Sequence, residues 1–342
     1  MLASAIPRKG LPVDLVKDEG KPAILHAPPA LDMREGCAWL AAIRAELRAG
    51  LDVEGAVLIR GLPVRDTTDF ALVRDAITRE RAHYREQATP RTSFGDDIYS
   101  STDFPVDQRI MPHNENSYTL EFPGLLLFGC LVPAEHGGAT PVADCRKVFN
   151  AIPQEMIGRF RAAGWGLIRN YTDYFGLGWR TAFGTQDPVE VMRYCAENKI
   201  GASWEAGGRL QTVQRRSAII RHPRLGQEVW FNHVAFWNVW SLAQEFREAL
   251  LGALTVAELP YNTVYGDGQP LTAQEIGMLL AAYDSATVRV PWQSGDIMVV
   301  DNILAAHGRD SYRGRRTVLV AMGEAVKLHL CAPTVEALPR IT

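Results

Sequence analysis

The chain has 342 residues, of which 47% are hydrophobic and 22% are charged. These fractions are typical of globular proteins, so a large core can form and extensive disorder is excluded. The 36 basic and 39 acidic residues give a net charge of −3, without a cluster of Lys or Arg. We therefore expect no nucleic-acid partner. The five cysteines are scattered and form no CxxC pair, which argues against a disulfide framework and a structural zinc site.

The sequence shows neither the apolar run of a signal peptide nor a stretch long enough to cross a membrane. This favours a cytoplasmic protein without a membrane partner. The length alone suggests two domains, but no linker or repeat divides the chain, so we expect a single domain over residues 1–342. Residues 171–226 have a mixed composition and are expected to form an insertion within it that serves as a lid.

The predicted elements alternate between a few helices and many short strands. Apolar residues spaced three and four apart predict a helix over residues 37–48, ended by Gly50. Further helices are predicted over residues 153–163, 242–259 and 272–283. Short apolar runs predict strands over residues 56–60, 125–131, 229–232, 287–290, 297–301 and 317–322. Without a regular βαβ alternation, this order predicts a mainly β fold, an antiparallel barrel or sandwich with flanking helices.

The first residues that indicate chemistry are His113 and Glu115, which stand two positions apart. On an extended strand both side chains would point to the same face and could bind one metal ion. Alone the pair is a weak signal, because any His two residues before an acid satisfies it. A plain structural pair is the alternative.

His307 follows an apolar strand that ends at Asp301. Two histidines and one carboxylate from distant strands can form a face that leaves open positions on Fe(II). The alternative is a hydrogen-bonded structural histidine.

Arg316 precedes the predicted strand over residues 317–322 and would share a face with Val318 and Val320. An arginine directed into an apolar barrel needs an anionic partner, which a small dicarboxylate would provide. An exposed charge at the strand end is the alternative reading. Thr140 follows a glycine turn at Gly137 and Gly138, a common feature that gains meaning only beside the other residues.

Taken together and in this order, these residues resemble the TauD/TfdA family of Fe(II)/2-oxoglutarate-dependent dioxygenases, over roughly residues 57–322. The glutamate in place of the more usual aspartate resembles the clavaminate synthase-like branch. The resemblance implies a double-stranded β-helix, or jelly roll, in which His113, Glu115 and His307 bind iron. It also implies that Thr140 and Arg316 hold the distal carboxylate of 2-oxoglutarate, with Arg313 as the second choice of arginine.

The implied reaction uses O2, converts 2-oxoglutarate to succinate and oxidises an unactivated C–H bond. Hydroxylation is the expected outcome, and desaturation or cyclisation are alternatives. Residues 89–92, 98–102 and 113–118 resemble a subgroup in specialised metabolism that includes enzymes acting on amino acids, free or tethered to a carrier protein. The candidate substrate contacts are Arg91, Ser117, Asn232 and His233.

Each of these four residues could instead belong to the core or to a solvated loop. Two other functions stay open at this point, a non-catalytic jelly-roll binding protein and a hydrolytic zinc enzyme that uses the same three ligands. The zinc enzyme is disfavoured because it leaves Arg316 and Thr140 without a role. The oligomeric state is also open, with a homo-oligomer among the options.

Overall fold

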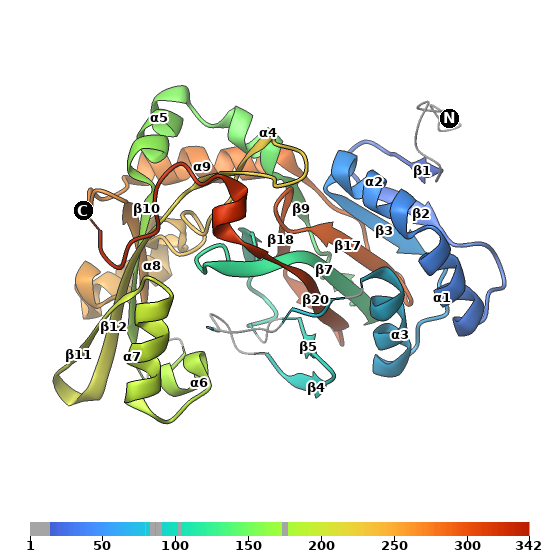
Figure 1. Ribbon diagram of the computed structural model, residues 1–342, viewed down its shortest axis with the longest axis horizontal. Helices are drawn as coiled ribbons and strands as arrows, with labels where there is room; N and C mark the ends of the chain where they lie inside the picture. The colour runs from blue at the N-terminus through green and yellow to red at the C-terminus, as the bar shows by residue number, and fades with distance from the viewer. Residues whose placement is uncertain are drawn as a thin grey trace.

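The computed structural model describes residues 14–78, 80–82, 86, 91–101, 104–172 and 177–341. Its centre is an eight-stranded sheet, which a second sheet of four strands faces (Figure 1). In sheet order the first consists of β1 (Leu15–Val16), β2 (Ala23–His26), β3 (Ala56–Arg60), β17 (Ile297–Asp301), β7 (Glu121–Val132), β20 (Thr317–Lys327), β5 (Ile98–Ser100) and β4 (Ser93–Gly95). The second consists of β16 (Thr287–Val288), β9 (Val142–Asp144), β18 (Ala305–Arg309) and β6 (Ile110–His113).

The central strands are almost continuously apolar because both faces of the large sheet are covered. In β7, Leu125 and Leu127 point to the helices on one face, whereas Leu126 and Phe128 point to the second sheet on the other. The same alternation occurs in β17 and β20. A strand with a period of two and two buried faces reads as one apolar run. Two facing, mostly antiparallel sheets confirm the expected mainly β, jelly-roll fold.

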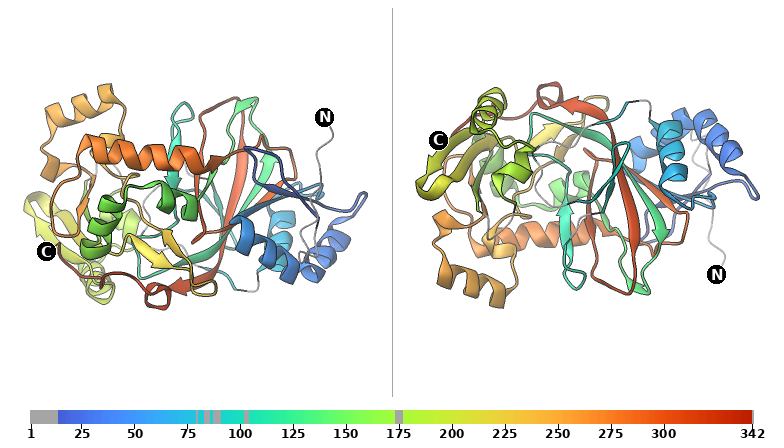
Figure 2. Two further views of the ribbon diagram at one scale, coloured as in Figure 1. Left: turned by 90° about the horizontal axis from the view of Figure 1, so that it is seen from above. Right: turned by 90° about the horizontal axis from the view of Figure 1, so that it is seen from below.

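Helices cover the outer faces of both sheets. The helices α1 (Met33–Ala42), α2 (Arg44–Glu54) and α3 (Thr67–Ile77) pack on the large sheet. On the back of the second sheet lie α4 (Cys145–Ala151), α5 (Gln154–Ala163), α9 (Ala273–Ala286) and the hairpin of β13 (Ile219–Arg221) and β14 (Glu228–Trp230). Figure 2 shows the orange helix α9 beside the green helices α4 and α5. None of the helices in the described part of the chain is long and apolar enough to span a membrane.

A further four-stranded sheet lies at the opposite end of the molecule from α1 to α3 (Figures 1 and 2). Its strands are β11 (Gly201–Glu205), β12 (Arg209–Arg216), β10 (Trp165–Tyr171) and β15 (Tyr261–Tyr265). With α6 (Trp179–Phe183) and α7 (Pro188–Glu197) it encloses a small core of its own around Trp179, Val191 and Leu210. Much of the segment 171–226 is therefore an ordered unit, and its action as a lid stays a prediction.

The remaining elements are short. The strands β8 (His136–Gly137) and β19 (Tyr312–Arg313) pair with each other, and α8 (Gln244–Ala253) lies near the third sheet. The 3-10 helices are η1 (Ala206–Gly208), η2 (Val239–Ser241), η3 (Val256–Glu258) and η4 (Leu328–Cys331).

The single helix predicted over residues 37–48 is wrong. Two helices, α1 and α2, meet at Ile43, whose φ of −95° and ψ of 13° interrupt the helix. The chain begins α1 earlier, because Asp32 and Glu35 form a capping box. Gly50 lies inside α2 and does not end it; the helix ends before Gly55.

The helix predicted over residues 242–259 is also shorter than expected. The helix α8 ends at Ala253, and a new capping box between Thr255 and Glu258 starts η3. The strands predicted over residues 229–232 and 287–290 end two residues early, at Trp230 and Val288. By contrast, the strands predicted over residues 56–60 and 297–301 have the expected bounds.

Candidate active site

The pairing of β18 with β6 brings the two candidate histidines together. His307 lies directly opposite His113 in the register of the two strands, and their ring centroids are 4.5 Å apart. This pairing is very close beside the histidine, since a Cβ atom on Gly308 would lie 2.5 Å from the carbonyl oxygen of Ile110. The glycine after His307 therefore allows the approach that joins the two ligands.

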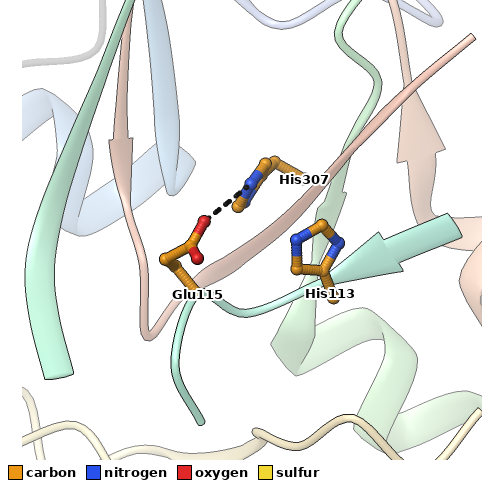
Figure 3. Close-up of side chains that lie close together, drawn as sticks. All are labelled: His113, Glu115 and His307. Atoms are coloured by element: carbon orange, nitrogen blue, oxygen red, sulfur yellow. Dashed lines mark ion pairs between the residues drawn. The ribbon is translucent and has the colours of Figure 1, made fainter. Parts of the chain in front are cut away.

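The side chain of Glu115 lies beside the two histidines, but the backbone that carries it is not the predicted extended strand. The strand β6 ends at His113, so Glu115 does not lie on an extended strand but in the turn that follows. Asn116 in this turn has a left-handed φ of 53°. The turn still directs the carboxylate towards His307, and Glu115 Oε2 lies 3.7 Å from His307 Nε2 (Figure 3).

Together the three side chains form a buried donor set. One potential ligand atom from each of His113, Glu115 and His307 lies within 4.8 Å of the others. Burial lowers the pKa of both histidines, so their rings are neutral, which is the form that binds a metal ion. His113 Nδ1 donates to the carbonyl of Met111 at 2.9 Å, which leaves the lone pair on Nε2.

These residues fit Fe(II). Two neutral imidazoles and one carboxylate form the ligand face that non-haem iron enzymes use, with the remaining positions open. His307 directs its Nε2 towards the Glu115 carboxylate, as a ligand to a shared metal ion would.

Three of the four candidate substrate residues lie beside this donor set. Arg91 Nη2 donates to Glu115 Oε2 at 2.7 Å, and both side chains are buried. The Ser117 hydroxyl and His233 Nδ1 are 2.6 Å apart. The His233 ring lies 5.2 Å from the His113 ring, and burial holds the pKa of His233 well below its usual value.

Asn232, the fourth candidate, uses its amide on the backbone. Its Nδ2 donates to the carbonyl of Ala218 at 3.1 Å, and its Oδ1 accepts from the N–H of Val234 at 3.0 Å. These contacts brace the turn after β14, and a contact of Asn232 with substrate stays a prediction.

A small cavity adjoins the donor set, and three arginines line it, Arg91, Arg309 and Arg316. Arg316 Nε donates to the carbonyl of Gly138 at 2.9 Å, and its Nη2 lies 3.5 Å from Thr140 Oγ1. Gly138 has a φ of 70°, and a Cβ there would lie 3.0 Å from Arg316 Cδ, so the glycine turn lets the arginine lie across it. The cavity is lined by Arg91, Ser101, Ile110, His113, Phe128, Thr140, His307, Gly308, Arg309, Arg316 and Val320.

The positive charges of the arginines in this cavity favour the binding of an anion. Burial and the nearby Arg309 lower the pKa of Arg316 to about 10, so Arg316 stays charged at neutral pH. The described residues that line the cavity include no acidic side chain. A small dicarboxylate could pair with Arg316 and Thr140 at one end and reach the donor set at the other. Arg313, the second choice, is exposed on β19 and does not line the cavity.

Arg309 is a residue of this site that the sequence reasoning missed. Its guanidinium donates to the carbonyls of Phe104, Pro105 and Gln108, and it lines the cavity beside Arg316. A signal was present, because Arg309 stands two residues after His307 on a strand and so shares its face.

The chain is similar to known proteins over most of its length. Residues 20–322 match the family described as "Taurine catabolism dioxygenase TauD, TfdA family". The dapdiamide synthesis protein DdaC of Enterobacter agglomerans is 36% identical over 276 residues, which cover 81% of this chain and 84% of DdaC. A clavaminate synthase-like protein of Arabidopsis thaliana is 28% identical over 318 residues, which cover 88% of this chain and 93% of that protein.

Among solved structures, PvcB of Pseudomonas aeruginosa is similar with a TM-score of 0.52 and 12% identity, over 98% of both chains. At this identity the likeness shows a shared fold. The family match covers most of the chain and includes all three residues of the donor set. The chain therefore belongs to the TauD/TfdA family of Fe(II)/2-oxoglutarate-dependent dioxygenases.

Proposed function

We propose that this enzyme hydroxylates an unactivated C–H bond of an amino acid or an aminoacyl group in specialised metabolism. The observation that carries the proposal is the buried donor set of His113, Glu115 and His307 beside a cavity lined by three arginines. When bound there, iron would activate O2 while 2-oxoglutarate is decarboxylated to succinate.

The residues of the site would have separate roles in this reaction. His113, Glu115 and His307 would hold the metal and leave one side of it open. Arg316 and Thr140 would hold the distal carboxylate of 2-oxoglutarate, because a guanidinium and a hydroxyl together supply charged and neutral hydrogen bonds to it. Both residues would thereby orient the co-substrate towards the donor set and exclude water from its cavity.

The proposed substrate class rests on the polar and aromatic side chains around Glu115 and His113. There Arg91 supplies a cation and the Ser117–His233 pair supplies polar atoms, while Phe236 packs 4.5 Å from the His113 ring. A few polar groups among aromatic side chains suit a small zwitterion such as an amino acid.

The names of similar proteins support small-molecule biosynthesis. DdaC is named for dapdiamide synthesis, and PvcB is described as an Fe, alpha-ketoglutarate dependent oxygenase from an isonitrile synthetic pathway. We place the reaction in the cytoplasm, whose reducing conditions suit five free cysteines.

A spectroscopic titration tests the metal and co-substrate assignment. Under anaerobic conditions, Fe(II) and 2-oxoglutarate are expected to give a weak visible charge-transfer band with the wild-type protein. His113→Ala and His307→Ala should abolish this band, whereas His26→Ala, an exposed histidine at the end of β2, should retain it. A band that persists unchanged in both ligand variants would contradict the assignment.

A succinate assay tests the substrate class. Free amino acids and the same amino acids tethered to a carrier protein are compared for their ability to stimulate succinate formation, with mass spectrometry of the product. We expect stimulation by one of these two forms and a product heavier by one oxygen. An enzyme stimulated by neither form would contradict the proposed substrate class, and a complete lack of succinate would indicate a non-catalytic binding protein.

A further inference from the structure

We propose that Asn302 is a positioning residue that fixes the metal-binding geometry of Glu115. This inference rests on the proposed metal site. Asn302 contributes no ligand itself; it lies in the turn between β17 and β18, and its side chain is fully buried.

Glu115 depends on such support because it lies beyond the end of β6. No strand ladder continues to the turn at residues 114–117, since β6 ends at His113. Instead, one side chain bonds to both polar groups of the Glu115 backbone. Asn302 Oδ1 accepts from the Glu115 N–H at 2.7 Å, and Asn302 Nδ2 donates to the Glu115 carbonyl at 2.9 Å. The amide thus takes the place of a neighbouring strand.

Asn302 is itself fixed to the large sheet. Its Nδ2 also donates to the carbonyl of Pro123 at 2.7 Å, and its own N–H donates to the carbonyl of Gly124 at 3.0 Å. Both acceptors belong to β7, a central strand of the large sheet. In return, Asn114 Nδ2 donates to the carbonyl of Asn302 at 2.7 Å. The two asparagines therefore lock the turn that carries Glu115 onto the sheet.

The same turn leads to His307. Residues 302–304 join β17 to β18, and Asp301 holds them with a carboxylate oxygen that accepts the N–H groups of Ile303 and Leu304 at 3.0 and 3.1 Å. The other oxygen of Asp301 lies 3.1 Å from His222 Nε2 in a buried contact. One rigid turn thus sets where β18 starts and where the Glu115 backbone lies.

Loss of the Asn302 amide would leave the N–H and carbonyl of Glu115 buried without these partners. A buried polar group without a partner is unstable, so the turn is expected to rearrange and move the carboxylate. Residues that orient metal ligands in this way typically change metal affinity about 10- to 100-fold when they are replaced.

Metal affinity and thermal stability, measured together, test the proposal. Co(II) binding to the full-length apoprotein is followed by calorimetry for wild type, Asn302→Ala and a matched control, Asn170→Ala. Asn170 is a suitable control because it also donates to two backbone carbonyls, of Ala257 and Leu259, and accepts one hydrogen bond, from Gln211. We expect Asn302→Ala to weaken Co(II) binding at least about 10-fold, and Asn170→Ala to keep the wild-type affinity whatever its loss in Tm.

If Asn302→Ala does not fold, Asn302→Asp takes its place with the same expected loss. The aspartate keeps the size and the acceptor for the Glu115 N–H, but its second oxygen would face two carbonyl oxygens. Wild-type Co(II) affinity in the folded Asn302 variant, or an equal loss in Asn170→Ala, would overturn the proposal and leave the proposed function intact. A wild-type protein that binds neither Co(II) nor Fe(II) would instead refute the metal site, and the role of Asn302 with it.

Discussion

Two arginines near the co-substrate cavity differ in burial, and this difference separates their expected roles. Arg316 is half-buried, lines the cavity and lies 3.5 Å from Thr140 Oγ1. Arg313 is exposed on β19. A hydrogen bond to a charged group contributes about 1.5–3 kcal/mol, or roughly 10- to 100-fold in affinity. We therefore expect Arg316→Gln to weaken 2-oxoglutarate binding by roughly this factor, measured by calorimetry with the metal-loaded protein under anaerobic conditions.

Arg313→Gln is the matched control, since it removes the same charge three positions away. It is expected to leave the affinity for 2-oxoglutarate unchanged, and metal binding should be retained in both variants. If Arg313→Gln weakened 2-oxoglutarate binding and Arg316→Gln did not, the second choice made from the sequence would be the right one.

At the residue scale, the sequence could predict the donors but not their supports. His113, Glu115 and His307 were identifiable because few residue types bind metals, and the order of all the candidate residues along the chain is specific. Asn302 was not identifiable from the sequence, because its role depends on hydrogen bonds to backbone atoms of Glu115, which lies 187 residues away along the chain. Asparagine side chains form many kinds of hydrogen bond in proteins. The position of an asparagine in the sequence does not indicate which backbone groups its side chain will bind.

At the scale of elements, the bounds of strands were predicted correctly where burial of both faces produces a continuous apolar run in the sequence. Strands β3 and β17 have the bounds expected from their apolar runs. The prediction was wrong where the apolar pattern continues across an interruption of the helix, as at Ile43 between α1 and α2. It failed also for Glu115, because a His-x-Glu spacing fits an extended strand and a turn equally well. The elements of the core were thus predictable, and the turns that place the ligands were not.

The close pairing of β6 and β18 gives a prediction at this scale. In Gly308→Ala, the new Cβ would lie 2.5 Å from the carbonyl oxygen of Ile110, so the two strands must separate next to His307. Overpacking of this kind costs about 1–3 kcal/mol. We expect a lower Tm, measured by calorimetry, together with weaker Co(II) binding, because the separation moves His307 away from His113.

Gly158→Ala is the control for this variant. Gly158 lies in α5, and its Cβ would meet nothing within 4 Å, so alanine should maintain or slightly raise the Tm through its higher helix propensity. Equal Tm values for Gly308→Ala and the wild type would show that the strand pairing tolerates a side chain at this position.

The described residues of the molecule form four hydrophobic cores, and the five cysteines are distributed among them. Cys145 and Cys331 lie in the core beneath α4, α5 and α9, Cys130 lies between the two facing sheets, and Cys195 lies in the small core of the segment 171–226. Cys37 is only half-buried, at the margin of the core under α1 to α3. The reactivity of each thiol therefore reports on the packing of one region.

We expect a thiol reagent at pH 8 to modify the native protein at Cys37 only, and slowly. Burial raises the pKa of Cys130, Cys145 and Cys195 to about 12 and that of Cys331 to about 11, so almost none of these thiols is ionised. Burial also raises the pKa of Cys37. Mass spectrometry after labelling, with full labelling in denaturant as the control, counts and locates the modified residues. Rapid native labelling of Cys195 alone would show that the segment 171–226 opens its own core instead of moving as a packed unit.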